Sequence, residues 1–331
     1  MKGSSNSVLI IGGGAAGCAA AAELSRRGVP STIVEAADRL GGLAGSHCCK
    51  STERCERCDA CLPMDVRRDA LNAADVTVMT SSLVVDARMD DGLVVSISGP
   101  GGREEARFGS VIVAIGAMPF DPALDPRLGY GSVPGVLSSL EVDRGVRDGT
   151  FIIPDGARMA VVLCVGSRDV GRGAPYCSKV CCKYGYQLAR HLQTARPGLD
   201  VTFLYMDWRP LDGDLDALSR WEASGASVIR SRPAEIVERN GGPVVRYAAP
   251  ADDVREQAFD LVMLTVGLLP SPGNDRLSTL LGVPLDDLGF FPTAHGRVLA
   301  AGCCTGPKGI DESVKEGIAA AGRAMSIAEG E

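Results

Sequence analysis

A short apolar run that leads directly into a glycine-rich turn constrains the fold of this chain more than any other feature. Residues 7–11 read SVLII, and Gly12, Gly14 and Gly17 follow in a G-x-G-x-x-G pattern at the start of an alanine-rich helical stretch. A second β-favouring run covers residues 31–35. A strand, a glycine turn, a helix and a strand within about 30 residues form a βαβ unit, the setting in which this pattern binds a dinucleotide. The sequence therefore predicts a dinucleotide-binding domain at its start.

The residue types in this turn match what a dinucleotide requires. Gly12 permits the tight turn, Gly14 lets the backbone approach a pyrophosphate, and Gly17 lets the helix pack closely on the strand. The helix N-terminus favours the negative charge of the phosphates. Glu35, at the end of the second strand, is placed to accept the ribose hydroxyls. The predicted contacts of this unit are Gly12, Gly14, Ala15, Ala16, Gly17 and Glu35. The alternative is a glycine-rich turn that binds no ligand.

Composition and charge narrow the class of protein. The chain has 331 residues, of which 45% are hydrophobic, and its 41 glycines favour an α/β enzyme with many tight turns. A net charge of −7 provides no basic surface for nucleic acid or for an anionic membrane. No apolar run is long enough for a membrane span, and no apolar leader precedes a cleavage site, so we expect a cytoplasmic protein.

The residues after Glu35 point to the kind of dinucleotide. Arg39, Gly41 and Gly42 form a pattern that resembles the second half of the FAD fingerprint in glutathione-reductase-like flavoproteins. Further on, the segment 111–116 (VIVAIG) is similar to the strand and glycine turn that pass the cofactor in that superfamily. It contributes Ala114 and Gly116 as predicted cofactor contacts. The resemblance implies that this domain binds FAD.

The domain is predicted to be discontinuous. Residues 298–302 form another strand that ends in Gly302, and the helix that follows, from about Glu312 to Ala328, resembles the element that faces the flavin. We therefore assign 1–118 and 285–331 to an FAD-binding domain with a cysteine-rich insertion at 47–62. Residues 119–284 form an inserted domain that begins with a proline-rich linker, Pro119 to Pro134.

The inserted domain carries a second βαβ pattern. Strands are predicted at 159–166, 201–206 and 261–267, with a helix at 176–193. This pattern predicts the α/β fold class, and the resemblance to glutathione-reductase-like flavoproteins implies two dinucleotide-binding domains of the glutathione- and thioredoxin-reductase type. The cysteines of the second domain, described next, predict an iron–sulfur site there.

Cysteines stand where the second dinucleotide loop is expected. Cys164 ends the first strand of the inserted domain, and the next predicted helix carries Cys177, Cys181 and Cys182. On a helix, Cys177 and Cys181 lie one turn apart with Cys182 adjacent, so three sulfurs can face Cys164. Four thiolates suit a [4Fe-4S] cluster. A four-cysteine zinc site and buried structural cysteines are the alternatives, although zinc cysteines usually occur as C-x2-4-C pairs. We call these four residues the central cysteine set.

A second group of cysteines lies in the insertion at 47–62. Cys55, Cys58 and Cys61 form a C-x2-C-x2-C pattern similar to ferredoxin loops, and Cys49 is the predicted fourth ligand, with Cys48 as the alternative. Cys49, Cys55, Cys58 and Cys61 are called the N-terminal cysteine set. A second [4Fe-4S] cluster, a zinc site and free thiols are the possibilities, and His47 is a further ligand candidate.

The order and spacing of these motifs identify a family. The stretch CVGSRD…PYCSKVCCKYGYQLA from Cys164 closely resembles the A subunit of heterodisulfide reductases. So do residues 205–209 (YMDWR), GLLPSPGN from Gly267 and AGCCTGPKGIDESVKEGIAAA from Ala301. The resemblance implies that the central cysteine set ligates a [4Fe-4S] cluster. It also implies that a loop contacts the flavin, formed by Pro307, Lys308, Gly309 and Ile310.

The resemblance is to the short bacterial members of that family. The chain has no C-x2-C-x2-C-x3-C-P ferredoxin-like segment. It is similar to the A subunit of the sulfur-oxidising heterodisulfide-reductase-like complex, and the N-terminal cysteine set favours that branch. The A subunit of the quinone-interacting oxidoreductase complex of sulfate reduction is the alternative.

These features predict an oxidoreductase subunit that passes electrons between FAD and clusters and thereby splits electron pairs. The resemblance adds B- and C-type partner subunits, a homodimer, and disulfide or persulfide sulfur as the substrate. A zinc-stabilised scaffold with a flavin-type fold is an alternative of another class. A self-sufficient NAD(P)H-dependent disulfide reductase is a third, but the redox C-x4-C pair expected in the first domain is absent. No catalytic residue is assigned.

Overall fold

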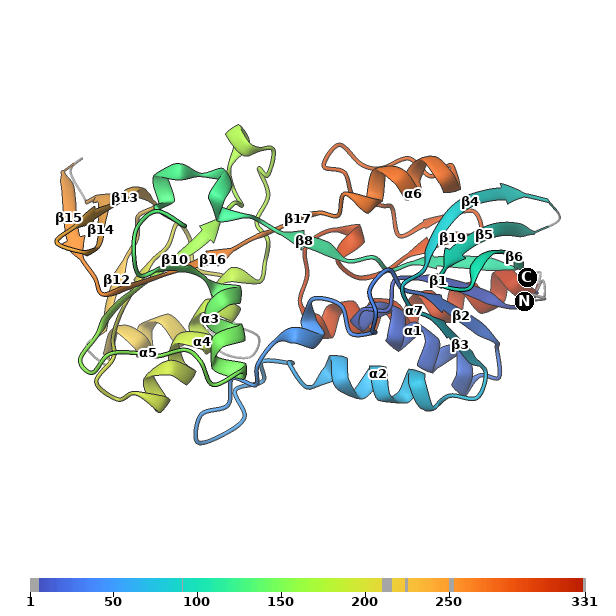
Figure 1. Cartoon of the computed structure of the whole chain (residues 1–331), viewed down its shortest axis with the longest axis horizontal. Coiled ribbons are helices and arrows are strands. Elements are labelled where there is room, and N and C mark those ends of the chain that lie inside the picture. Colours follow the sequence, from blue (N-terminus) through green and yellow to red (C-terminus); the bar gives the residue numbers. More distant parts are fainter. Residues whose placement is uncertain (1–5, 91, 210–215, 224–225, 250–252, 330–331) are drawn as a thin grey trace. The chain divides into compact units, whose positions relative to one another are not determined.

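The computed structural model describes residues 6–90, 92–209, 216–223, 226–249 and 253–329. The chain forms two compact units (Figure 1). The first unit contains Met1–Ser46, Asp59–Met118 and Leu269–Glu331, and the second contains His47–Cys58 and Pro119–Leu268. Each unit is built around a sheet of mainly parallel strands with helices packed on it, which confirms the predicted α/β class.

The first unit is built on a six-stranded sheet. Its order is β18-β19-β7-β1-β2-β3, and every pair is parallel except β18 with β19. The strands are β1 (Val8–Ile11), β2 (Ser31–Val34), β3 (Val76–Met79), β7 (Ser110–Val113), β18 (Ala294–His295) and β19 (Val298–Ala300). The strands predicted at 7–11, 31–35, 111–116 and 298–302 are the four central members of this sheet.

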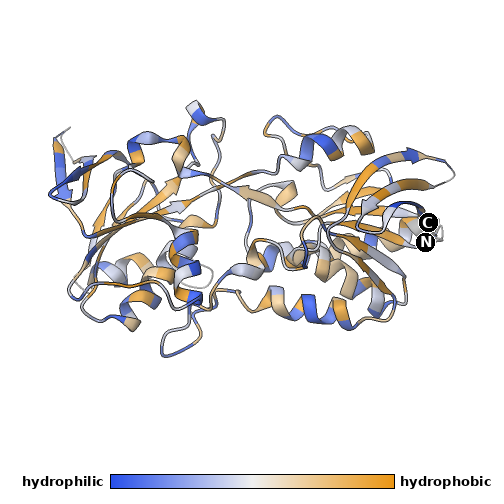
Figure 2. Cartoon of the chain, in the orientation of Figure 1, coloured by the Kyte–Doolittle hydropathy of each residue, from blue (hydrophilic) through white to orange (hydrophobic). Residues whose placement is uncertain are grey.

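Alternation along these short strands gives the sheet two buried faces, as expected for parallel sheets. Val8 and Ile10 pack with the helices α1 (Ala15–Arg26), α2 (Leu62–Asn72) and α7 (Ile310–Glu329). Leu9 and Ile11 pack on the other face, against α6 (Gly273–Leu281) and an antiparallel sheet of β4 (Leu83–Met89), β5 (Leu93–Gly99) and β6 (Gly102–Phe108). Figure 2 shows the strands of the parallel sheets largely in the colour of hydrophobic residues.

Helices α1 and α7 lie side by side on the sheet (Figure 1) and approach closely because small residues separate them. A Cβ atom on Gly317 of α7 would lie 2.2 Å from the carbonyl oxygen of Ala16 in α1. A Cβ atom on Gly302, which precedes α7, would lie 2.9 Å from the Cβ of Ala16. The backbones of Gly302 and Gly317 therefore pack directly against Ala16 in the first turn of α1, with no side chain between them.

The second unit is built on a parallel sheet with the order β12-β11-β10-β16-β9. The strands are β9 (Val136–Ser138), β10 (Arg158–Val165), β11 (Asp200–Leu204), β12 (Ser227–Ile229) and β16 (Leu261–Val266). Met159, Val161 and Leu163 of β10 pack in a core with residues of α3 (Ser139–Arg147), α4 (Cys181–Ala195) and α5 (Ala217–Ala223). An antiparallel sheet joins β13 (Pro233–Arg239), β14 (Gly242–Ala248) and β15 (Val254–Ala258).

The chain passes between the units through β8 (Ala117–Pro119) and β17 (Leu268–Pro270), which form a two-stranded sheet. The proline-rich segment after β8 is not an open linker. It forms two short 3-10 turns, η2 (Pro122–Leu124) and η3 (Pro126–Leu128), whose first backbone N–H groups are capped by the side chains of Asp121 and Asp125. None of the helices in the described ranges has the length and apolar character that a membrane span requires.

The structure differs from the predicted domain division in two places. The cysteine-rich segment 47–58 belongs to the second unit, because Cys48 and Lys50 are buried in that unit. The return to the first unit occurs at Leu269 rather than 285, because Leu277 of α6 and the following Val283 are buried in the first unit's core.

The helix predicted at 176–193 begins later than expected, at Cys181. Two features keep the preceding residues out of the helix. Lys179 has a left-handed backbone with φ of 61°, and the hydroxyl of Ser178 accepts the N–H of Leu268 at 2.8 Å. Cys177 therefore lies in the turn before the helix. The prediction that it lies one helical turn from Cys181 is wrong.

We expect Gly317→Ala to lower the free energy of unfolding by about 1–3 kcal/mol, because the added methyl group forces α7 away from α1. Gly322→Ala in the same helix is the matched control, since a Cβ atom there meets nothing within 4 Å. It should leave stability unchanged or raise it by about 1 kcal/mol through helix propensity. Denaturant unfolding of both variants measures the difference, and equal effects would refute the close-packing account.

Candidate functional site

The glycine turn between β1 and α1 has the geometry that a pyrophosphate requires. Gly12 has φ of 103°, and a Cβ atom on it would lie 2.5 Å from the carbonyl oxygen of Ala114. A Cβ atom on Gly17 would lie 1.9 Å from the carbonyl oxygen of Gly12. Gly14 differs, because a Cβ atom there meets only the Cα of Gly42, at 4.0 Å. Two of the glycines are thus fixed by crowding, while the third leaves open space above the backbone.

The residues after β2 complete this side of the site. The carboxylate of Glu35 accepts the N–H of Gly13 at 2.6 Å and the N–H of Ala37 at 2.8 Å, so it lies at the glycine turn. Gly41 and Gly42 both have positive φ, and a Cβ atom on Gly42 would lie 3.0 Å from the Cα of Gly14. Two glycine segments therefore face each other with no side chain between them, which fits a dinucleotide phosphate. The side chain of Arg39 is exposed.

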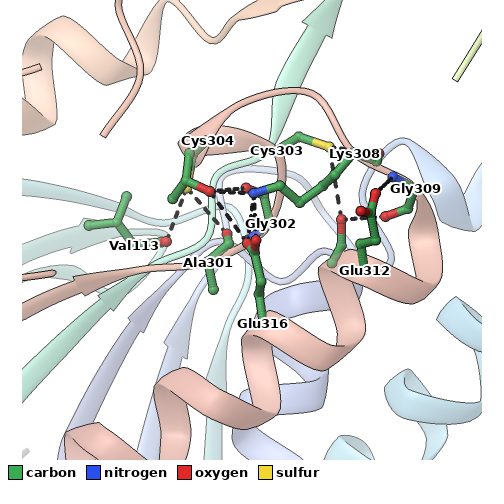
Figure 3. A network of polar contacts seen from close by, with 11 residues as sticks. Val113, Ala301, Gly302, Cys303, Cys304, Lys308, Gly309, Glu312 and Glu316 are labelled. Carbon is green, nitrogen blue, oxygen red and sulfur yellow. Dashed lines mark hydrogen bonds and ion pairs between the residues drawn. The ribbon is translucent and has the colours of Figure 1, made fainter. Parts of the chain in front are cut away.

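The approach to α7 is held by a polar network centred on Glu316 (Figure 3). Its carboxylate accepts the N–H of Gly302 at 2.9 Å, the hydroxyl of Thr305 at 3.3 Å and the ammonium of Lys308 at 2.7 Å. The side chain of Lys308 is only 8% exposed and also donates to Thr305. One side chain of α7 thus fixes the whole turn from 302 to 308.

The predicted flavin loop lies on this network. Pro307 is buried, Gly309 and Ile310 are half-buried, and the N–H of Gly309 donates to the Glu312 carboxylate at 2.9 Å. The other predicted contacts of the closing strands are Ala114, which is buried, and Gly116, which has φ of 72°. The sequence prediction missed Glu316. A glutamate on a long helix is usually a solvent-exposed residue, so nothing near Glu316 in the sequence indicates that it binds Gly302, Thr305 and Lys308.

The vicinal cysteines of this turn are a half-buried thiol, Cys303, and a buried one, Cys304. The Sγ of Cys304 donates to the carbonyl oxygens of Val113 and Ala301, both at 3.2 Å, and that of Cys303 donates to Lys308 at 3.4 Å. Burial raises the pKa of Cys304 to about 12 and also raises the pKa of Cys303. Both residues are therefore protonated donors at neutral pH and help to hold the turn.

The structure brings the central cysteine set together. Cys164 ends β10 at a register shift against β16 and has a left-handed backbone, with φ of 61°. Burial and then the neighbouring thiols of Cys182 and Cys177 raise the pKa of Cys164 to about 11. Burial also raises the pKa of Cys181, with added contributions from Cys164, Cys182 and Cys177. A strained backbone at a non-glycine residue is typical of a functional site.

Four polar groups lie around the central cysteine set, two that donate to its sulfurs and two that are buried donors without a partner. The backbone N–H groups of Lys179 and Arg209 donate to the sulfurs of Cys177 and Cys182, at 3.3 and 3.4 Å. The hydroxyl of Ser167 and the indole N–H of Trp208 are buried without a hydrogen-bond partner in the described part of the chain. Ser167 follows Cys164 by three residues, and Trp208 lies between the two residues whose backbones contact Cys182. Buried donors are costly to leave unpaired, and the sulfides of a cluster would be acceptors for them.

Across the described residues, no group of three or more His, Cys, Asp or Glu side chains is arranged to hold a metal ion. A zinc ion and a cluster would use the four thiols differently, because one zinc ion takes all four sulfurs whereas each cysteine of a cubane binds a different iron.

The turn that follows β10 differs from the glycine turn of the first unit in what covers its first glycine. A Cβ atom on Gly166 would lie 1.9 Å from the ring of Phe120, which covers the turn. A Cβ atom on Gly267 would lie 2.6 Å from the Oγ of Ser178. Side chains of its own unit therefore cover Gly166 and the neighbouring Gly267, in contrast to the open space above Gly14.

The cysteines of the N-terminal set are more exposed than those of the central set, and they are divided between the two units. Cys49 is exposed, and hydrogen bonds from Ser51, with a smaller contribution from Cys58, lower the pKa of Cys49. Cys55 is exposed and Cys58 half-buried, while Cys61 is exposed and belongs to the first unit, where it precedes α2. Cys48 lies in the core of the second unit, and burial raises its pKa to about 12.

Comparison of the sequence with known proteins gives consistent results. Residues 10–61 match the model of an NAD(P)-binding Rossmann-like domain. The chain is 37% identical over 252 residues to an iron-sulfur A subunit of the CoB–CoM heterodisulfide reductase of Methanopyrus kandleri, an alignment that covers 69% of the chain and 38% of the relative. It is 33% identical over 268 residues to the corresponding A subunit of Methanocaldococcus jannaschii, which covers 71% of the chain and 41% of the relative. The chain thus spans about two fifths of the length of these relatives.

Similar solved structures include thioredoxin reductases. The structure matches that of the T. acidophilum enzyme with a TM-score of 0.66 at 20% identity, over 96% of this chain and 97% of that one. The Lactococcus lactis enzyme also gives a TM-score of 0.66, at 19% identity, over 98% and 100% of the two chains. These matches confirm the predicted fold, with two dinucleotide-binding-type domains.

After treatment with a chelator, we expect iodoacetamide at pH 7 to label Cys49 first and Cys181 and Cys304 last. The thiolate is the reactive form, and Cys49 combines exposure with a lowered pKa, whereas burial raises the pKa of the other two. Mass spectrometry of timed samples gives the order. Labelling of Cys181 as fast as Cys49 would show that the burial of Cys181 does not protect its thiol.

Proposed function

The chain belongs to the A-subunit family of heterodisulfide reductases, and on that premise we propose that it is an electron-transferring oxidoreductase subunit that binds FAD and [4Fe-4S] clusters. One observation carries the proposal. The glycine turn of the first unit is open above Gly14, whereas in the equivalent turn of the second unit Phe120 covers Gly166 and four cysteine thiols lie near one another. A second nicotinamide-type site has been replaced by ligands for a one-electron centre.

The first unit supplies the flavin site. The backbone of Gly14 and Gly42 would hold the pyrophosphate, and Glu35, which follows β2, would bind the ribose. The turn from Gly302 to Lys308, fixed by Glu316, would hold the N-terminus of α7 ready for the flavin. FAD, when bound, exchanges electrons either singly or in pairs.

The second unit supplies the cluster site. Cys164, Cys177, Cys181 and Cys182 are the ligands, and the N–H groups of Lys179 and Arg209 donate to two of their sulfurs. Hydrogen bonds to ligand sulfur and exclusion of water both adjust the potential of such a centre. An aromatic cluster packs beside α4 and supports this shielding, formed by Tyr186, Phe203, Tyr205, Trp208 and Trp221.

The turn that follows β10 in the second unit also bears on the partners. Phe120 covers Gly166, Ser178 packs against Gly267, and cysteines stand where the G-x-G-x-x-G pattern of an NAD(P)H site is expected. Electrons therefore enter or leave through other proteins, which we infer to be B- and C-type subunits of a cytoplasmic heterodisulfide-reductase-like complex acting on disulfide or persulfide sulfur. The N-terminal cysteine set favours the short sulfur-oxidising branch and a second cluster, and by the same resemblance the protein is a homodimer.

Cysteine variants of the anaerobically purified chain test the cluster assignment. We expect Cys181→Ala to lose about four iron atoms per flavin while the flavin absorption is kept, because the lost ligand belongs to the second unit only. Cys18→Ala is the matched control, since Cys18 is fully buried in α1 and its thiol donates to Gly13. It should keep its iron.

Three results would overturn the proposal. Zinc in place of iron in the wild-type protein would favour a scaffold. Equal iron content in both variants would remove Cys181 from the ligand set. Reduction of the flavin by NADH at enzyme-like rates in the isolated chain would show that the second unit still binds a nicotinamide.

A further inference from the structure

Asp143 is a buried carboxylate that the cofactor sites do not use. It lies on α3, is 1% exposed, and serves neither as a helix cap nor as a surface charge. Burial alone would raise its pKa, but hydrogen bonds and the charge of the groups around it, His47 and Lys50 foremost, hold the pKa well below its usual range. Asp143 is therefore an anion inside the second unit.

Three of the four donors to this anion come from consecutive parts of the cysteine-rich segment. The N–H of Cys48 donates to Asp143 at 2.6 Å, the ammonium of Lys50 at 2.8 Å, and the Nδ1 of His47 lies at 3.3 Å. Lys50 is 2% exposed, which is rare for a lysine, and its ammonium also donates to the carbonyl of Cys48 at 3.2 Å. The cysteine-rich segment therefore places a buried, charged side chain, Lys50, in the core of the second unit, where it pairs with Asp143.

The fourth donor comes from α4, the helix that begins with Cys181 and Cys182. The hydroxyl of Tyr184 donates to Asp143 at 2.5 Å, and the ammonium of Lys50 lies 4.6 Å above the Tyr184 ring. A cation over an aromatic ring is a favourable contact, and it is strengthened by burial. Asp143 thus joins the cysteine-rich segment to the helix that carries two of the central cysteines.

The same face of α4 continues to hold the segment. The amide of Gln187 donates to the carbonyl of Glu56 at 2.7 Å, and the Nδ1 of His191 lies 2.6 Å from the carbonyl of Ser51. Tyr184, Gln187 and His191 are spaced three and four residues apart, so they share one face of the helix. The helix that carries Cys181 and Cys182 therefore also holds the segment from which Cys49, Cys55 and Cys58 come.

We propose that Asp143 is a positioning residue that seats the cysteine-rich segment 47–58 on α4, and so holds Cys49, Cys55 and Cys58, the members of the N-terminal cysteine set that belong to the second unit, at a fixed place relative to the central cysteine set. A site on rigid, supported elements is more precise than one on a free loop. For the metal site this inference rests on the proposed function, in which the N-terminal set binds a second cluster. The seating itself does not depend on that cluster.

Limited trypsin digestion of the full chain tests the seating. Trypsin can cut after Arg54, whose side chain is 78% exposed. Asp143→Asn leaves Lys50 buried without its counter-charge, and we expect cleavage of the segment to become at least about a hundredfold faster. Tyr184→Phe keeps the ion pair and removes one charge-assisted hydrogen bond, so about a tenfold increase is expected, and this milder variant decides the question if Asp143→Asn does not fold.

Asp148→Asn is the matched control. Asp148 follows the end of the same helix, its side chain is 45% exposed, and it pairs only with its neighbour Arg147 among the contacts of the described residues. Its cleavage rate should equal that of the wild type. Unchanged cleavage in both Asp143→Asn and Tyr184→Phe would overturn the proposal.

Iron analysis and electron paramagnetic resonance separate positioning from general stability. We expect Asp143→Asn to fall from about eight to about four iron atoms per flavin, with loss of one cluster signal and retention of the flavin and the other signal. A merely structural lesion would diminish all three together, and full iron content would contradict the proposal. A wild-type content of about four iron atoms would instead refute the second cluster of the proposed function, and the digestion would still decide the seating.

Discussion

Crowding of the backbone at the two strand-to-helix turns decides what each unit of this molecule can bind. In the first unit, Gly12 and Gly17 are fixed by contacts of 2.5 and 1.9 Å that any Cβ atom would make, and this tight packing leaves Gly14 open. In the second unit, the ring of Phe120 fills the space over Gly166, and cysteines occupy the strand end and the helix start. The same topology therefore presents bare backbone in one place and thiols in the other.

The turn before α7 depends on a single carboxylate. Glu316 satisfies a backbone N–H, a hydroxyl and a nearly buried ammonium, so three groups from different parts of the turn are fixed to one helix. The thiols of Cys303 and Cys304 add hydrogen bonds to backbone carbonyls of the same region. A loop fixed in this way loses little entropy when it closes on a ligand, which is the physical advantage of preorganisation.

The second unit shows how a buried charge can organise distant segments. Asp143 receives donors from residues nearly 100 positions earlier in the chain and from a helix about 40 positions later. Each partner would be costly to bury alone, and the group becomes tolerable only when all its members are present. This mutual requirement explains why the segment 47–58 belongs to the second unit.

Local patterns in the sequence determined the elements of the parallel sheets, the open glycine turn, and the central cysteine set as a group, because strand periodicity, glycine spacing and cysteine spacing are short-range signals. They did not determine that α4 begins at Cys181, that α6 packs in the first unit, or that Glu316 and Asp143 act as anchors. Those features depend on contacts between residues far apart in the chain. The free energy of burying Lys50 or of covering Gly166 with Phe120 exists only once the tertiary structure has brought the partners together.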